Sequence, residues 1–271
     1  MNNGLLSLRF SLDRHGRTRM VERKQRYPLT TTAVLPMESE LGALVYTHNA
    51  AGSVFGGDRL HTNLHLGNDA AMCLSTPSAT RLQGEGLSVQ TTNIELSSGA
   101  YFESIPDMLI PHPKAEYRQQ TSINLSDGAE AILAESLAPG RVARGEKNIY
   151  NTVSTRLEAS FRGQTILVDA STFRPQEASP TLEGALASGG YVGTLIILTQ
   201  NGDQEKLAAE VSARLEKLPG VYGGAAVLAS GYGAISRFLA ENAPALRIAT
   251  QVAWNAARYH IRGRPAPQLR K

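Results

Sequence analysis

Three segments of the chain share one pattern: residues 64–70 read LHLGNDA, residues 94–100 read IELSSGA and residues 123–129 read INLSDGA. Their offsets are 30 and 29 residues. In each, an aliphatic pair ends a strand, residues that accept positive φ form a turn, and a second strand begins. A period near 30 predicts stacked β-strand layers, as in a β-solenoid or a sandwich. A meander of similar hairpins is the alternative.

The wider pattern extends this prediction. Short alternating segments broken by Gly, Asn, Asp and Ser predict a mainly β body with internal repeats over residues 1–172. Residues 174–190, rich in Pro, Gly, Ala and Ser, indicate a connection. We expect residues 173–271 to form a small α+β portion, packed on the body as one domain.

Two helices are expected in that C-terminal portion. Asp203 is a helix cap, and a helix after it carries leucines and a valine on one face until Pro219 and Gly220. Pro244 opens a second helix that ends near Arg262, before Gly263. Strands are expected at residues 195–198 and in the runs AAVLAS and AISRFLA.

Composition bounds the class of protein. The 271 residues are 42% hydrophobic and 19% charged, as in globular proteins with a proper core. The sequence lacks an apolar run of about 18 residues and a secretory pattern at its start, so we expect no membrane association. The single cysteine, Cys73, suits a reducing compartment, which predicts a cytoplasmic protein.

Charge is concentrated at the C-terminal end. Residues 242–271 hold six cations and no Asp or Glu, whereas the preceding residues hold 21 cations and 24 anions. Such an end could dock an acidic protein surface or a nucleic acid, or simply be solvated. Aromatic residues make up only 6%, and no nucleic-acid-binding motif is present, which disfavours nucleic acid.

Common catalytic and metal-binding motifs are missing from the sequence. No phosphate loop, HExxH, CxxC, EF-hand or GxSxG pattern occurs. His61 and His65 share one face of a predicted strand but lie about 13 Å apart along it, too far to bind one ion together. His61, His65 and Cys73 are therefore only weak candidates for transient metal contacts.

Glycine-rich stretches with ionisable residues stand out instead. Asp58 follows three glycines, Glu103 lies on a predicted strand, and Glu146 stands near Arg141 and Arg144. One interpretation is that these acids cap turns and pair with arginines. The other is that Asp58, Glu103 and Glu146 line a polar cavity or channel, where they could carry a cation or perform acid–base chemistry.

The same stretches resemble the UreD (UreH) family of urease accessory proteins. Five family motifs appear in order between about residues 4 and 266: residues 49–60 (NAAGSVFGGDRL), 74–81 (LSTPSATR), 102–106 (FESIP), 140–146 (GRVARGE), and 254–258 (WNAAR) with 263–266 (GRPA).

The resemblance implies a β-rich scaffold without enzymatic activity. It implies a complex with UreF and the GTPase UreG that docks on apo-urease and delivers nickel, with no tightly bound cofactor and nickel only in transit through an internal tunnel. Motif by motif, the candidate tunnel residues are Asp58, Thr80, Glu103 and Glu146, with Arg141 and Arg144 as structural or gating partners.

The last predicted helix is a candidate contact for UreF. Its anchor would be Trp254, with Arg258, Arg262 and Arg264 around it. Alternatively, Trp254 packs on the β body. Two other functions remain open at this point: a β-solenoid carbohydrate-active enzyme that uses two of the three acids, and an interaction domain unrelated to nickel.

Overall fold

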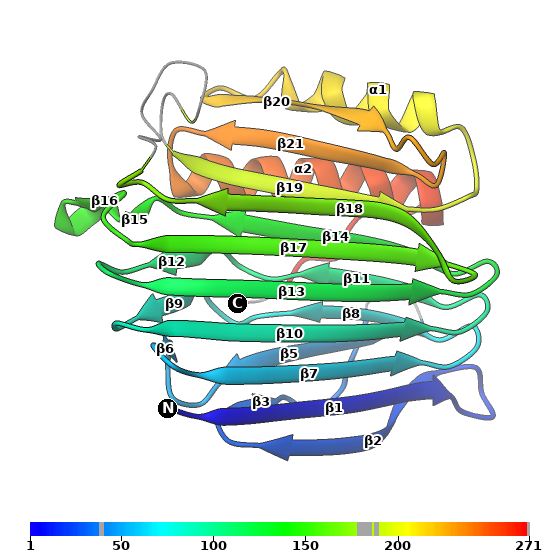
Figure 1. Ribbon diagram of the computed structural model, residues 1–271. Helices are drawn as coiled ribbons and strands as arrows, with labels where there is room; N and C mark the ends of the chain where they lie inside the picture. The colour runs from blue at the N-terminus through cyan, green and yellow to red at the C-terminus, as the bar shows by residue number, and fades with distance from the viewer. Residues whose placement is uncertain (38–40, 178–185, 187–189, 270–271) are drawn as a thin grey trace.

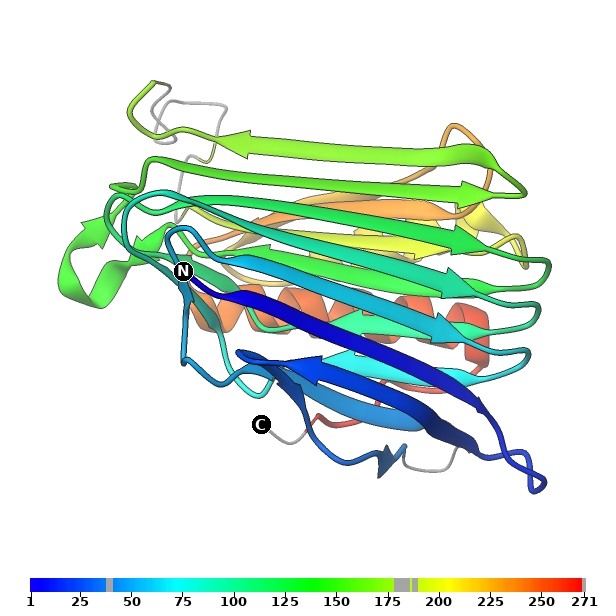
Figure 2. The same cartoon turned by 60° about the horizontal axis from the view of Figure 1, so that its bottom comes forward.

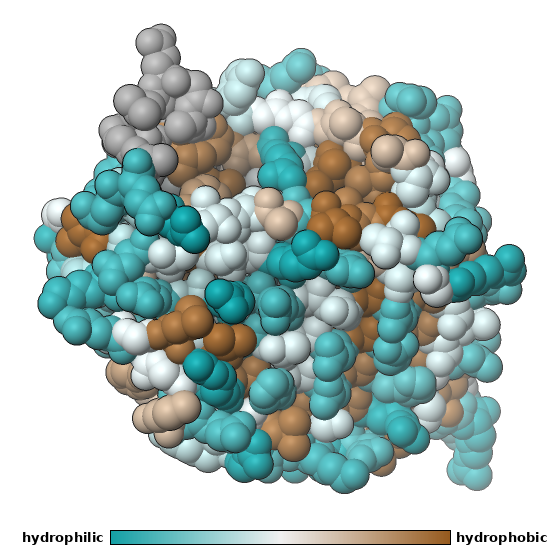
Figure 3. All heavy atoms as spheres, in the orientation of Figure 1, coloured by the Kyte–Doolittle hydropathy of each residue, from teal (hydrophilic) through white to brown (hydrophobic). Residues whose placement is uncertain are grey.

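Two large β-sheets face each other in the computed structural model, which describes residues 1–37, 41–177, 186 and 190–269 (Figure 1). We call the seven-stranded sheet, of order β18-β17-β13-β10-β7-β1-β2, sheet 1. Its strands are β1 (Asn3–Leu12), β2 (Thr18–Arg26), β7 (Arg59–Leu66), β10 (Leu87–Leu96), β13 (Glu116–Leu125), β17 (Thr152–Phe161) and β18 (Gln164–Phe173). Hydrophilic and neutral side chains cover most of its outer face (Figure 3).

Sheet 2 has the order β20-β21-β19-β14-β11-β8-β5-β3. These strands are β3 (Leu29–Thr31), β5 (Ala43–Asn49), β8 (Ala71–Ser75), β11 (Tyr101–Ile105), β14 (Glu130–Leu137), β19 (Tyr191–Leu198), β20 (Val221–Val227) and β21 (Ala234–Ala240). Short strands join it at the sides: β4 (Leu35–Pro36), β6 (Val54–Phe55), β9 (Thr80–Gln83) and β12 (Leu109–Pro111).

The repeats form successive coils of a β-solenoid. Each coil runs along sheet 1, turns into sheet 2, passes through a short strand such as β9 or β12, and returns to sheet 1. Equivalent strands pair in parallel, so Leu64, Ile94 and Ile123 of the three repeats stand side by side. The expected mainly β fold with stacked strand layers and two C-terminal helices is confirmed.

The turns between the two sheets stack in the same way. Asp69, Gly99 and Gly128 occupy the same place in their repeats, and all three have positive φ angles of 57°, 68° and 70°. A side chain at Gly99 would clash with the carboxylate of Asp69 in the neighbouring coil. Glycine adopts this backbone angle at position 99 without strain and leaves room for the Asp69 carboxylate.

The C-terminal portion extends sheet 2 and covers it. Strand β19 pairs antiparallel with β14, and β21 and β20 follow. Helices α1 (Gln204–Leu215) and α2 (Ala243–Arg262) pack on the outer face of sheet 2 (Figures 1 and 2). The boundaries agree with the expected caps, because Asp203 accepts a hydrogen bond from the Lys206 amide and Gly263 is left-handed.

Some expectations concern residues beyond this description. Most of the connection at residues 174–190, and the last two basic residues, lie outside the described ranges. The division at residue 172 stays a prediction. Within the described ranges, no helix combines the length and apolar composition that crossing a membrane requires.

Two apolar cores hold the layers together. The first lies between the sheets and includes Leu66, Leu96 and Phe102. The second lies between sheet 2 and the helices and includes Leu207 and Trp254. Burial of these side chains stabilises each layer against the next, by about 1.5–3 kcal/mol for each large residue.

Candidate functional site

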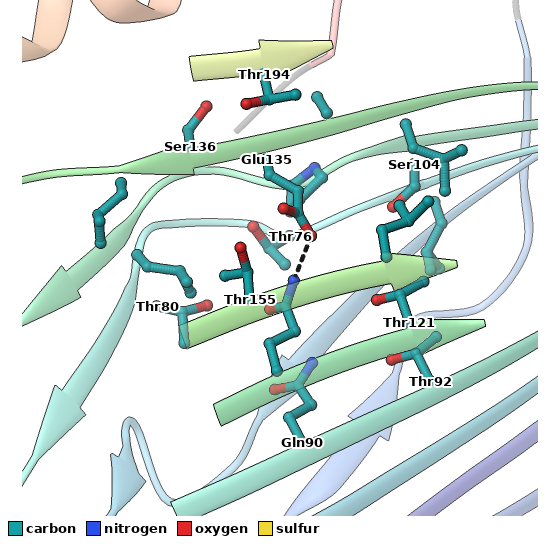
Figure 4. A pocket seen from close by; sticks show the side chains of 18 of the residues that line it. Thr76, Thr80, Gln90, Thr92, Ser104, Thr121, Glu135, Ser136, Thr155 and Thr194 are labelled. Carbon is teal, nitrogen blue, oxygen red and sulfur yellow. Dashed lines mark hydrogen bonds between the residues drawn. The ribbon is translucent and has the colours of Figure 1, made fainter. Parts of the chain in front are cut away.

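A polar cavity of about 170 Å³ lies between the two sheets. Its lining crosses the stack of strands from Thr47 on β5 to Thr194 on β19. About half of the lining residues carry hydroxyl or amide groups, several of which are labelled in Figure 4, and apolar side chains lie between them. The polar lining residues include Thr62, Gln90, Thr92, Gln119, Thr121 and Thr155 from sheet 1, and Thr76, Ser104, Glu135 and Ser136 from sheet 2 and its turns.

The alternation of each strand explains the position of this cavity. On β10, Gln90, Thr92, Ile94 and Leu96 all point to the interior, since side chains two apart share a face. The first two are polar and line the cavity, Ile94 lines the cavity and also belongs to the apolar core, and Leu96 belongs to the core. A third apolar cluster, which includes Leu60, lies toward the other end of the strands. The polar band is therefore flanked by apolar layers on both sides.

Three carboxylates line the cavity: Asp107, Glu135 and Asp169. Glu135 accepts a 2.6 Å hydrogen bond from Nε2 of Gln119, drawn in Figure 4. Asp169 lines the same cavity and is paired with Arg237. Burial, and next the charge of Asp169, raise the pKa of Glu135 to about 7. Glu135 can thus exchange a proton near neutral pH.

A tyrosine marks the boundary of the polar band. The hydroxyl of Tyr117 donates toward the amide oxygens of Gln90 and Gln119, each 3.1 Å away. Burial first, and then Glu135, raise the pKa of Tyr117, so its hydroxyl stays protonated. It can hold the two amides in place but contributes no charge.

This lining suits a hard or borderline cation that keeps part of its water shell. Carboxylate, hydroxyl and amide oxygens replace water molecules around such ions, and flexible sites bind them without trapping them. Among the described residues, no group of three or more His, Cys, Asp or Glu side chains could hold a metal ion.

Of the tunnel candidates from the sequence, Thr80 lines the cavity and the other five do not. Asp58 is fully buried at a turn, where it accepts hydrogen bonds from the amide of Asn2 at 2.7 Å and the amide of Phe55 at 3.0 Å. It ties the N-terminal residues to the solenoid. This is the turn-capping interpretation rather than the channel interpretation.

Glu103 lies on the other face of sheet 2, beneath α2. Its Oε1 accepts hydrogen bonds from the Tyr101 hydroxyl at 2.6 Å, Trp254 Nε1 at 2.8 Å and Arg258 Nε at 2.9 Å. Trp254 and Arg258 are themselves buried. Trp254 therefore packs on the β body, the alternative to its role as an exposed anchor for a partner.

Arg141, Arg144 and Glu146 belong to a small hairpin formed by β15 (Gly140–Arg141) and β16 (Glu146–Lys147). Arg141 makes two hydrogen bonds to Glu146, at 2.5 and 2.7 Å, across its base. Arg144 is exposed in the 3₁₀ turn (Val142–Arg144) at its tip. The pair stabilises the hairpin.

The remaining candidates are scattered. Arg262 lies over the ring of Tyr101, 4.7 Å from its centre, and Arg264 is exposed. His61 and His65 lie on the outer face of sheet 1, as their spacing predicted, and Cys73 is fully buried on sheet 2. Their proposed contacts with partners or metal stay predictions.

Sequence reasoning missed Glu135, Asp169 and the glutamine and threonine side chains. The signal was present: on β10 and β13, polar residues occupy the same alternating positions as the core aliphatics that follow them. When the inward-facing residues of a strand are polar in its first half and apolar in its second half, the pattern indicates a polar band in the interior.

A model of the family described as UreD urease accessory protein matches residues 2–271, almost the whole chain that builds this solenoid. The chain belongs to the UreD family. Among curated UreD proteins, one from Streptomyces griseus is 30% identical, over 99% of this chain and 93% of its own length. One from Mycolicibacterium gilvum is 30% identical, over 95% and 94%. One from Haloarcula marismortui is 28% identical, over 84% and 76%.

Proposed function

We propose that this UreD-family chain is a non-catalytic cytoplasmic scaffold that acts with UreF and the GTPase UreG on apo-urease, and that nickel passes through the cavity between its sheets. The observation that carries the proposal is the polar band that crosses the strands from β5 to β19 between apolar layers. Such a band is costly in a protein interior unless its groups are hydrogen-bonded to one another or to water, or bind an ion.

The lining fits nickel as cargo. Nickel(II) accepts oxygen ligands, and its transfer to another protein requires contacts that are weak enough to release it. Glu135 and Asp169 provide negative charge along the path, while hydroxyl and amide groups such as Thr92 and Gln119 can take the place of water. Because the pKa of Glu135 lies near neutrality, an arriving cation would displace its proton.

The carbohydrate-active alternative loses its proposed carboxylate pair. Asp58 is bound to Asn2, Glu103 to Arg258 and Glu146 to Arg141, so each acid has a separate structural partner. Glycoside hydrolysis requires two carboxyl groups that flank one bond. The remaining alternative, an interaction domain unrelated to nickel, predicts that deletion of the gene leaves urease unaffected.

The test uses cells that carry a urease operon from which this gene is deleted and restored. Matched pairs of variants change neighbouring residues on opposite faces of one strand. Thr92→Val and Gln119→Leu alter the cavity, whereas Thr91→Val and Gln120→Leu make the same changes on the outer face. Nickel per purified urease and the amount of soluble chain are measured together.

We expect the cavity variants to lower nickel per urease and the outer-face variants to leave it unchanged, at equal amounts of soluble chain. If the cavity and outer-face variants gave equal nickel per urease, and urease activation still required the gene, the chain would act as a scaffold that conducts no metal. If urease from the deletion strain contained as much nickel as urease from the wild type, the chain would have no role in urease maturation. Copurification of UreF and UreG with the tagged chain tests the proposed partners.

A further inference from the structure

Sheet 2 has a gap beside the polar cavity. Strand β11 pairs with β14 only from Tyr101 opposite Glu130 to Ser104 opposite Leu133. The next contact on that side is a single pair, Leu109 of β12 with Leu137 of β14. Between them, Ile105 still pairs with β8 but no longer with β14, and residues 106–108 leave the sheet, so residues 134–136 of β14 have no ladder partner on that side.

A second cavity, of about 210 Å³, lies over this gap on the outer face of sheet 2. It is bounded by Arg247 and Thr250 of α2 and by Gln268 and Leu269 of the chain after α2. That segment turns back along the helix, since the Ala266 amide donates to Asn255 (Figure 2). Three residues line both cavities: Pro106, Asp107 and Ser136. At the gap, side chains of these residues therefore lie between the two cavities.

An ion pair stands at this point. The side chain of Asp107 is 8% exposed, and that of Arg247 is 57% exposed. Arg247 Nε and Nη2 each lie 3.4 Å from a carboxylate oxygen of Asp107, at the long end for hydrogen bonds. The carboxylate thus faces inward and the guanidinium outward. A pair with one side so exposed contributes little stability, so a competing cation can displace the arginine.

We propose that this gap is a mouth of the inter-sheet cavity, and that Asp107 is the carboxylate that receives a hydrated divalent cation there when Arg247 moves aside. The inference rests on the proposed conduction of nickel and adds the place and the residue. Arg247 pairs with the carboxylate when no cation is present, and Asp107 Oδ1 also accepts a hydrogen bond from the Met108 amide at 2.8 Å. Ser136 lines both cavities, and Glu135, the residue before it on β14, lines the inter-sheet cavity. A protein seated on the first half of α2 would stand directly over the opening.

The first test is nickel per urease in cells that carry Asp107→Asn, which keeps the size of the side chain and removes its charge. Asp127→Asn is the control, because Asp127 also pairs with an arginine, Arg162, but on the surface away from both cavities. We expect a several-fold loss of nickel for Asp107→Asn alone, at an unchanged amount of soluble chain. An equal nickel content in the two variants would overturn the proposal.

A charge exchange separates transport from structure. The double variant Asp107→Arg with Arg247→Asp restores an ion pair but places the positive group on the inner side. If the pair matters only for folding, the exchange recovers the nickel content lost in Asp107→Asn. We expect the nickel content to stay low. Recovery to the wild-type value would contradict the proposal that Asp107 receives the cation at this gap.

Access through the gap is measured directly by thiol labelling of the complex purified from these cells. In a Cys73→Ser background, Ser136→Cys is treated with a small cationic methanethiosulfonate, and Ser98→Cys on an exposed turn serves as the control. We expect Arg247→Ala to accelerate labelling at position 136 and not at 98. An unreactive or unaccelerated Cys at 136 would show the gap closed to cations of that size.

These results are distinguishable from failure of the proposed function. If Thr92→Val and Gln119→Leu lower the nickel content but the Asp107 variants do not, the cavity conducts and its mouth lies elsewhere. If neither set lowers it, conduction itself fails.

Discussion

Glu103 on β11 and Arg258 on α2 form a buried ion pair, with 2.9 Å between Oε1 and Nε, although 155 residues separate them in the chain. Their side chains are 0% and 3% exposed. Trp254 donates to the same carboxylate oxygen from one turn earlier on the helix. Two of the family motifs thus meet at the joint between helix and solenoid, away from the polar cavity.

Breaking this pair from one side should destabilise the protein strongly. Glu103→Ala leaves the buried Arg258 without its carboxylate, a change that typically costs about 3–5 kcal/mol. We expect the free energy of unfolding, measured with urea, to fall by that order. Glu158→Ala, which breaks an exposed pair with Arg156, is the control and should have little effect. A loss as small as that of the control would mean that the pair does not hold α2.

Glu135 should give the protein a measurable pH dependence. Its pKa rises from 4.5 to about 7 in the folded chain, so the folded state holds the proton more tightly than the unfolded state. The resulting stabilisation is present below pH 4.5 and is lost as the pH rises through 7, by roughly 3 kcal/mol at most. Relative to Glu135→Gln, the wild type should lose stability over that window in urea unfolding. Parallel pH profiles would show that Glu135 ionises normally.

Asp58→Ala should loosen the N-terminus without altering the cavity. The substitution leaves the partly buried amides of Asn2 and Phe55 without their acceptor, at up to about 1–3 kcal/mol for each unpaired group. We expect faster hydrogen exchange along β1, with Asp58→Asn intermediate because its amide oxygen still accepts. Nickel per urease, corrected for soluble chain, should stay normal. A specific nickel defect at normal stability would return Asp58 to the conduction path.

The hairpin that carries Arg141 and Glu146 should depend on one glycine and tolerate change at another. Gly140 has φ of 135°, and a side chain there would clash with the carbonyl of Glu146. Gly145 has φ of 74° and open space around it. Thermal unfolding should therefore show a larger loss for Gly140→Ala than for Gly145→Ala, whose cost is about 1–2 kcal/mol of backbone strain. Equal losses would indicate that the hairpin relaxes around position 140.

The repeat, the turns and the helix caps were predictable because each depends on residues that are neighbours in the sequence. The 30-residue period equals one coil, so the pattern that contains Leu64, Ile94 and Ile123 already placed these residues in adjacent strands. Asp203 and Gly263 act within one helical turn of the residues they cap. The family motifs likewise identified the family.

The function of individual acids was not predictable in this way. Asp58, Glu103 and Glu146 share a local context of glycine and charge, yet one ties the N-terminus, one anchors α2 and one closes a hairpin. The interpretation in which the acids cap turns and pair with arginines describes Asp58 and Glu146 better than the channel interpretation does.

By itself, the sequence determined the strand alternation, the stacking period, the two helices and membership of the UreD family. Tertiary structure alone decided which polar groups meet in the interior and where the sheet opens. The physical reason is range: alternation and capping are set by backbone geometry over a few residues. The contacts of Glu135 with Gln119, and of Asp107 with Arg247, exist only because the coils and α2 stack in space. Chain separation of 16 residues in one case and 140 in the other leaves no local signal for either contact.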